Sequence, residues 1–155
     1  MNFILGLTVF CLSVGISILL SKKHVDRLNY YNSFYSFNNS LKNEVSFTKK
    51  SIITIISSNK HKNDYFNKRL TAKFINKDIM IDKPYFITNE EIAYLDGYLD
   101  SIGALDAKTQ IELLNNAENT LKDNLSKCQN DSKRYKSLYV KLGVLIGLLM
   151  FVLII

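Results

Sequence analysis

The chain has 155 residues, of which 47% are hydrophobic and 22% are charged, and its formal net charge is +6. All 20 basic and 14 acidic residues lie between Lys22 and Lys141, so both ends of the chain are uncharged and apolar. The charged middle has the size of one small domain, which excludes a two-domain enzyme and a large α/β fold.

The N-terminal segment is long enough to cross a membrane. Residues 3–20 carry no charge, and as a helix they would span about 27 Å, close to the hydrocarbon thickness of a bilayer. We therefore predict a transmembrane helix over residues 1–21. A cleaved signal peptide is the main alternative, but no Lys or Arg precedes the apolar run and no small-x-small cleavage site precedes Lys22.

The C-terminal segment is also apolar, but it is shorter. Residues 142–155 would form a helix of about 21 Å, which residues 138–140 extend while the Lys141 ammonium group reaches up to the lipid headgroups. We predict a second transmembrane helix over residues 142–155, with a helix that only dips into the membrane as the alternative. Gly143 and Gly147 form a Gly-x-x-x-Gly step that permits close helix packing in lipid. The alternative is that these two glycines have no packing partner.

Basic residues flank both apolar ends. The membrane-junction set comprises Lys22, Lys23, Arg27, Lys133, Arg134, Lys136 and Lys141. Such flanks are retained in the cytoplasm, so we predict that residues 22–141 form a cytoplasmic domain held in the cell membrane by both ends. Attraction to anionic membrane lipids explains this charge more simply than nucleic acid does. Cys11 and Cys128 cannot reach each other in this arrangement and suit a reducing compartment.

The first part of the domain has apolar residues at helical spacing. Steps of three or four place them on one face of a helix that continues from the membrane: Val25, Leu28, Tyr31, Phe34, Phe37, Leu41 and Val45. Residues 52–56 are read as helix, because we expect no second strand with which they could pair. A cap at Asn63 or Asp64 starts a short helix with Phe66 and Leu70 on one face, and residues 76–87 are loop-like.

The next helix has clear signals at both ends. Thr88 and Glu91 have the spacing of a capping box, in which each side chain accepts from the other residue's backbone N–H. Its predicted apolar face consists of Ile92, Leu95, Leu99 and Ile102. Gly103 supplies the residue that commonly ends a helix.

A long helix follows a cap at Asp106. From Ala107 to Lys141 there is no Pro or Gly, and apolar positions alternate steps of four and three, with Glu118 and Ser132 as weak points. Unbroken to Ile155, this helix would be about 75 Å long. We expect its seam to pack against helices of its own domain rather than to form a free coiled coil. The predicted fold is all-α: a membrane-anchored antiparallel helical bundle whose long C-terminal helix runs into the second membrane segment.

The sequence offers little chemistry. His24 and His61 have no Cys or carboxylate at ligand spacing and are expected to be solvated. Asp96 and Asp100 are four residues apart, as are Asp78 and Asp82, but a solvated helix face explains such pairs better than a metal site. Motifs of phosphate-binding loops, serine hydrolases and dithiol enzymes are missing from the sequence. We expect neither enzyme activity nor a cofactor or metal.

Three stretches resemble a known family in their order and in the two apolar ends. They are residues 41–47, which include Glu44; residues 99–106 with Gln110, which include Gly103 and Asp106; and residues 135–139, which lead into 142–148. The chain resembles stage III sporulation protein AB of endospore-forming bacteria. The soluble region of that family is similar to the cytoplasmic domain of the inner-membrane platform proteins of type II secretion systems. Residues 48–52 lack the family's usual proline and leucine, and residues 57–87 match poorly.

The resemblance implies a non-catalytic component of the secretion-like complex that the mother cell builds in the membrane facing the forespore. Its helical domain would dock a cytoplasmic ATPase and pass motion along the long helix to other membrane subunits. Gly103 and Asp106 would shape the turn between helices, and homo-oligomers are possible. Two alternatives remain open: a membrane-anchored coiled-coil scaffold for cell division or envelope organisation, and a holin-like pore former.

Overall fold

The computed structural model describes residues 2–47, 54, 56, 63–76, 81–102 and 106–154. Within these ranges lie four helices: α1 (Asn2–Phe47), α3 (Asp64–Phe74), α4 (Asn89–Ser101) and α5 (Ala107–Ile154). The described residues contain no strand, and Thr54 and Ile56 are helical, in agreement with the helix predicted for residues 52–56. The predicted all-α, antiparallel architecture is confirmed.

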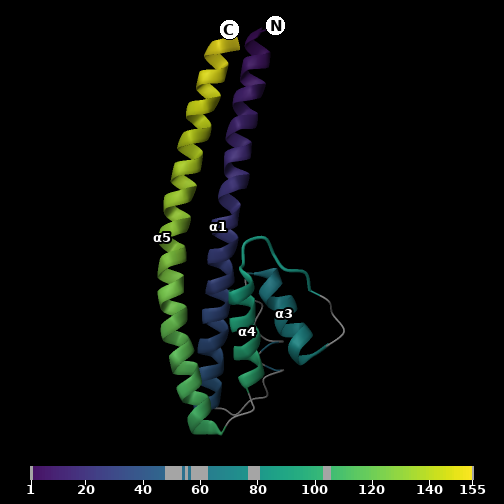
Figure 1. Cartoon of the computed structure of the whole chain (residues 1–155), viewed down its shortest axis with the longest axis vertical. Coiled ribbons are helices and arrows are strands. Elements are labelled where there is room, and N and C mark those ends of the chain that lie inside the picture. The colour runs from purple at the N-terminus through teal and green to yellow at the C-terminus, as the bar shows by residue number, and fades with distance from the viewer. Residues whose placement is uncertain are drawn as a thin grey trace.

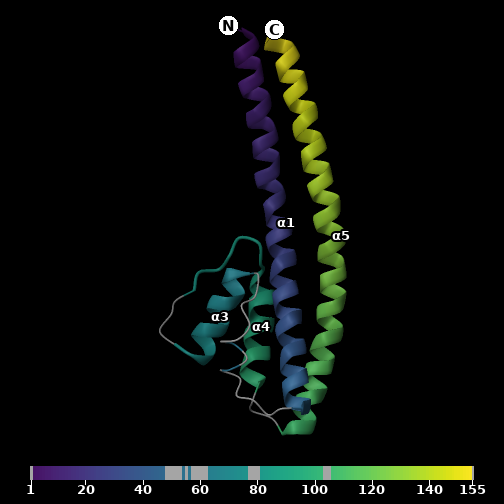
Figure 2. The ribbon, with the colours of Figure 1, turned by 180° about the vertical axis from the view of Figure 1, so that it is seen from behind.

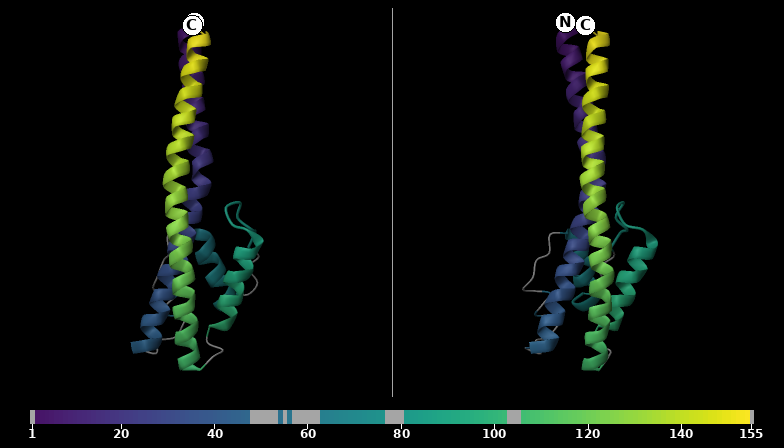
Figure 3. Two further views of the ribbon diagram at one scale, coloured as in Figure 1. Left: turned by 60° about the vertical axis from the view of Figure 1, so that its left-hand side comes forward. Right: turned by 90° about the vertical axis from the view of Figure 1, so that its left-hand side faces the viewer.

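Two long helices determine the shape of the molecule. α1 has 46 residues and α5 has 48, which corresponds to lengths of about 69 and 72 Å. They run antiparallel and side by side, with both termini at one end (Figure 1). α3 and α4 pack beside the half of α1 that is farther from the termini, as the view from behind also shows (Figure 2). The molecule thus has two parts (Figure 3). The halves of α1 and α5 nearer the termini form a two-helix stalk, which is narrow in the side views as well. The other halves of α1 and α5 form a thicker helical domain with α3 and α4, and the base of the stalk is where it joins this domain.

The core of the domain forms where the aromatic face of α1 meets the other three helices. Its fully buried large side chains include Tyr30, Phe34, Phe37 and Leu41 from α1, Phe66 and Leu70 from α3, Leu95 and Leu99 from α4, and Leu114 and Leu121 from α5. The Phe34 ring centroid lies 4.9 Å from that of Tyr98 and 5.6 Å from that of Phe66. The faces predicted from apolar spacing are therefore the faces that pack together.

One buried amide links three of the helices. Asn38 of α1 is fully buried, and its Nδ2 donates to the Leu114 carbonyl oxygen of α5 at 3.0 Å. Its Oδ1 accepts from the Tyr98 hydroxyl of α4 at 2.7 Å. Because a buried amide left unpaired costs about 1–3 kcal/mol, these two bonds favour a single register of α1 against α4 and α5.

The helix ends follow the predicted caps. Thr88 and Glu91 form both bonds of the capping box, and Asn63 Oδ1 accepts from Phe66 N at 3.0 Å. Asp106 Oδ2 accepts from the backbone N–H of Lys108 and Thr109 at the start of α5. Gly103, predicted to end the preceding helix, lies outside the described residues.

The predicted seam of α5 faces α1 of the same chain. Leu114, Leu121, Cys128 and Ser132 are buried along it. At the weak point, the Glu118 carboxylate lies 2.7 Å from Lys42 Nζ of α1 and 2.6 Å from Lys122 Nζ. The hydrogen bonds from these two ammonium groups hold the pKa of Glu118 below its ordinary value. An acidic residue is tolerated in the seam because cations from both helices reach it.

Candidate functional site

The stalk presents a largely apolar surface. α1 and α5 each contain a stretch long and apolar enough to cross a membrane, and only 11% of each stretch is buried. Leu19, Leu145 and Val152, for example, are 69%, 63% and 73% exposed. Because exposing apolar surface to water costs about 25 cal/mol per Å², these two helices indicate that the protein associates with a membrane.

Small residues hold the two stalk helices together. Gly143 packs against the Ser17 side chain, and a Cβ on Gly147 would come within 2.7 Å of the Phe10 ring. Ser13 Oγ donates to the Gly143 carbonyl oxygen at 2.9 Å, a bond between helices of the kind that stabilises helix pairs in lipid. The Gly-x-x-x-Gly step thus faces α1 of its own chain.

The stalk meets the domain at an aromatic stack. The centroid of the His24 ring lies 4.3 Å from that of Tyr135 and 6.3 Å from that of Tyr139. Both tyrosines come from α5. Partial burial is the main cause of the lowered pKa of His24. His24 was predicted to be solvated. This is wrong, because α5 covers one face of the ring; His61 lies outside the described residues.

The membrane-junction basic residues separate into two kinds. Six are exposed at the base of the stalk: Lys22, Lys23, Lys133, Arg134, Lys136 and Lys141. The seventh, Arg27, instead points into the domain, and its Nη2 lies 2.6 Å from Glu91 Oε1 of α4. Arg27 therefore serves a contact between helices in addition to its place near the membrane.

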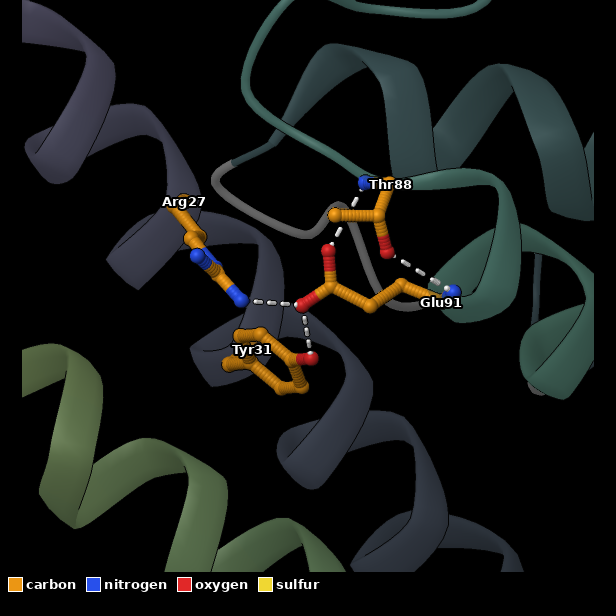
Figure 4. Close-up of polar contacts among 4 residues, drawn as sticks. All are labelled: Arg27, Tyr31, Thr88 and Glu91. Atoms are coloured by element: carbon orange, nitrogen blue, oxygen red, sulfur yellow. Dashed lines mark hydrogen bonds and ion pairs between the residues drawn. The ribbon is translucent and has the colours of Figure 1, made fainter.

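Glu91 joins α4 to α1 (Figure 4). Oε2 accepts from Thr88 N at 2.8 Å to complete the capping box. Oε1 accepts from Arg27 Nη2 at 2.6 Å and from the Tyr31 hydroxyl at 2.5 Å. A single carboxylate thus caps α4 and fastens it to two successive turns of α1.

The electrostatics of Glu91 favour its charged form. Partial burial works toward a higher pKa, but the hydrogen bonds from Thr88 N, Tyr31 and Arg27 outweigh it, so the pKa of Glu91 lies below its ordinary value. The neighbouring Tyr31 has a raised pKa, caused by burial and by its bond to the carboxylate. The site therefore keeps an ionised carboxylate and a neutral phenol at neutral pH, which suits a structural contact.

α3 and α4 are joined by two matched ion pairs. Asp96 and Asp100 of α4 face Arg69 and Lys73 of α3, and Arg69 Nε donates to Asp96 Oδ1 at 2.9 Å. The solvated helix face predicted for this aspartate pair holds for Asp100, whose side chain is 63% exposed, whereas Asp96 is partly covered by its contact with Arg69. Among the described residues, no group of three or more His, Cys, Asp or Glu side chains could hold a metal ion. Asp78 lies outside the described residues.

The remaining family-motif residues gather at the membrane-distal end. Glu44 is half-buried near the end of α1, and Gln110 is buried in the first turn of α5, next to the exposed Asp106. The end of α1 and the start of α5 thus lie at the same end of the molecule (Figure 1). This proximity follows from the antiparallel pairing of the two long helices.

A shallow groove of about 440 Å³ runs between α4 and α5. Its walls include Ala93, Gly97 and Ser101 of α4 and Leu113 and Ala117 of α5. Gly97 lies within α4, yet a Cβ built on it would have no neighbour within 4 Å. Since a glycine inside a helix costs about 0.5–1 kcal/mol relative to alanine, nothing in the described packing accounts for it. This groove was not predicted from the sequence, where its signal is a glycine inside an otherwise regular helix.

Comparison with known proteins gives one match. A family model described as stage III sporulation protein AB matches residues 2–155. No curated protein and no solved structure matches the chain. The match indicates a role in sporulation.

Proposed function

The chain belongs to the stage III sporulation protein AB family, and on this premise we propose that it is a non-catalytic membrane component of a secretion-like complex required for endospore formation. Its helical domain would act as the docking platform for a cytoplasmic ATPase and for other membrane subunits. The observation that carries this proposal is the pair of long helices, which connect an apolar stalk to a folded domain without a break.

The proposed topology places the domain in the cytoplasm and the stalk in the mother-cell membrane facing the forespore. Support comes from the six exposed basic residues at the base of the stalk, since such flanks remain cytoplasmic. Cys128 is buried and is a poor reporter. A cysteine at the exposed position Asn130, in a Cys128→Ser background, should stay unlabelled by an impermeant maleimide when the protein is expressed in the plasma membrane of intact, non-sporulating cells, and should react after lysis. Labelling in intact cells would show that the domain lies outside the cytoplasm, which is the reverse of the proposed topology.

The α4–α5 groove is the proposed docking surface. It is open, it combines apolar walls with the polar side chains of Asn116 and Thr120, and Gly97 leaves space along its α4 wall. A helix of the partner could lie between α4 and α5, since grooves between helices commonly receive an apolar helix face.

The groove can be tested by filling it. Gly97→Leu places a large side chain in the open space and removes the conformational cost of the glycine, so the fold should be retained. Full-length protein with this change should fail to support sporulation and should lose a nucleotide-binding partner captured by photocrosslinking from Thr120. Asn119→Leu, on the exposed surface of α5 and not among the residues that line the groove, is the matched control. Normal spore counts with Gly97→Leu would refute docking in the groove.

Transmission along α5 is a separate part of the proposal. Two glycines inserted after Ser126 would interrupt the helix between the domain and the stalk while both apolar stretches remain. We expect spore formation to fail with the protein still in the membrane fraction. The same insertion after Asp82, where the chain is not helical, should be tolerated. Normal spores from the Ser126 insertion would rule out transmission through the helix.

A further inference from the structure

The basic residues at the base of the stalk differ from most of those in the domain. We name the exposed set Lys22, Lys23, Lys133, Arg134, Lys136 and Lys141 the basic collar. None of its side chains forms an ion pair or hydrogen bond with any residue that the structure describes, whereas six basic residues of the domain do: Arg27, Lys42, Arg69, Lys73, Lys83 and Lys122. Cations without a protein partner are available to an external anion.

The collar forms one band, although its members come from opposite ends of the sequence. The stack of His24 on Tyr135 sets Lys22 and Lys23 of α1 beside residues 133–136 of α5. The contact between Ser17 and Gly143 places Lys141 slightly deeper along the same stalk. The antiparallel pairing of α1 and α5 therefore gathers six positive charges in one band around the base of the stalk.

This level coincides with the edge of the apolar surface. Leu19 and Leu20 of α1, on the side of Lys22 nearer the termini, are 69% and 56% exposed. Leu142 of α5, on the same side of the collar, is 48% exposed. Tyr135 and Tyr139 lie at the same level, and tyrosine commonly occupies the boundary between lipid tails and water. A ligand for the collar must therefore carry its negative charge at the headgroup depth of a bilayer.

Few negative charges of the protein compete for this band. Asp26, the acidic residue nearest on α1, accepts a hydrogen bond from the Tyr85 hydroxyl at 2.5 Å. Asp131 is exposed beside the collar on α5, so Asp26 and Asp131 together offset only two of its six charges. The net positive charge of the band is thus retained at the membrane boundary.

We propose that the basic collar binds the headgroups of anionic phospholipids, with phosphate oxygens accepting hydrogen bonds from its lysine and arginine side chains. Lipid binding would set the depth of the stalk and fix the domain close to the membrane surface. This inference rests on the membrane placement of the stalk but not on the docking of an ATPase.

The test uses the full chain in neutral detergent, titrated with phosphatidylglycerol or phosphatidylcholine and followed by native mass spectrometry. We expect tighter binding of phosphatidylglycerol, weakened by salt. Each cation removed should lower the affinity roughly fivefold, so Lys23→Gln with Lys136→Gln should lose about 25-fold. The matched control, Lys68→Gln with Lys108→Gln, removes two exposed charges from the domain and should bind as the parent does.

Three results would overturn the proposal. They are equal affinity for the two lipids, unchanged affinity in the Lys23 and Lys136 variant, and displacement of the lipid by equimolar inorganic phosphate, which would mean that the collar binds a free anion. Helicity measured by circular dichroism should match the parent in both double variants, because the four exchanged side chains are exposed and form no ion pair or hydrogen bond with a residue that the structure describes. Photocrosslinking of the ATPase from Thr120 is a separate readout, so loss of lipid selectivity and loss of docking can be distinguished.

Discussion

The two halves of the α1–α5 pair solve the same packing problem for different solvents. In the stalk, glycine and serine bring the helices close together while large apolar side chains face outward. In the domain, Phe34, Phe37 and Leu121 fill the space between helices, and most charges lie outside. Since lipid is as apolar as leucine, stalk packing depends on close contact and hydrogen bonds; in water, burial of large side chains drives it. One helix therefore follows opposite rules along its length.

The largest expected effect is the loss of stability on truncating Leu121 of α5, which is compared with Leu145 of the same helix. Leu121 is fully buried and Leu145 is 63% exposed on the stalk. Leu121→Ala should lower the free energy of unfolding of the domain by about 2–5 kcal/mol, and Leu145→Ala should change it by less than about 0.5 kcal/mol. Urea denaturation of the full chain in detergent, followed by circular dichroism, measures both. Similar losses for the two variants would break the distinction between the halves.

A glycine exchange tests the stalk directly. In Gly147→Leu the new side chain would collide with the Phe10 ring, so the helices should separate at a cost of about 1–3 kcal/mol. Spin labels at Ile4 and Val152, both exposed, should report a longer distance between the helices. Gly15→Leu is the control, because its Cβ would have no neighbour within 4 Å. An unchanged distance in Gly147→Leu would mean that the stalk helices do not pack through this glycine.

Glu91 tests how far polar contacts support the domain. Glu91→Gln weakens the bonds to Arg27 and Tyr31 and should cost about 1–2 kcal/mol, whereas the exposed neighbour Glu90 should tolerate the same change. Because the pKa of Glu91 is lowered on folding, its stabilising contribution is complete above its ordinary pKa of 4.5 and is lost as the pH falls through the folded-state value. Unfolding measured from pH 7 to 3 should depend less on pH in the variant. An equal pH dependence would contradict the assignment.

The smallest effect is expected at the α3–α4 surface. The Lys73–Asp100 pair is largely solvent-exposed, with 63% of the Asp100 side chain accessible. Exposed pairs contribute about 0.2–1 kcal/mol, so Lys73→Gln should lower the urea midpoint only slightly. Added salt, which screens the pair in the parent, should reduce this difference between parent and variant. A loss above about 2 kcal/mol would show that this pair contributes more than its exposure suggests.

Local signals predicted the helices well. The capping box at Thr88, the cap at Asn63 and the apolar spacing along α1 each depend on residues within one or two turns, so the sequence contains them in full. The two apolar stretches were equally accessible because length and the absence of charge define them. Apolar spacing also predicted the buried face of α5, and its imperfect seam favoured packing within the domain over a free coiled coil.

Contacts between helices were less predictable. Glu91 was recognised as a cap, but its second role depends on where α4 lies along α1, which the core sets. The Asp96 and Asp100 pair did carry a signal: Arg69 and Lys73 have the same spacing of four with opposite charge. The sequence also left open which helix packs against Gly143 and Gly147, because a Gly-x-x-x-Gly pattern permits close packing without specifying the partner helix. His24 was misjudged because its ring partner, Tyr135, is over a hundred residues away.

The inward orientation of Gly143 and Gly147 has a consequence for assembly. A neighbouring subunit in the bilayer cannot pack against these two glycines, because α1 of the same chain already covers them. The outer surface of the stalk consists mostly of leucine and isoleucine, but on α1 it also exposes the small residues Cys11 and Gly15. If stalks of neighbouring subunits pack closely, the contact therefore has to use this face of α1 and not the Gly-x-x-x-Gly step of α5.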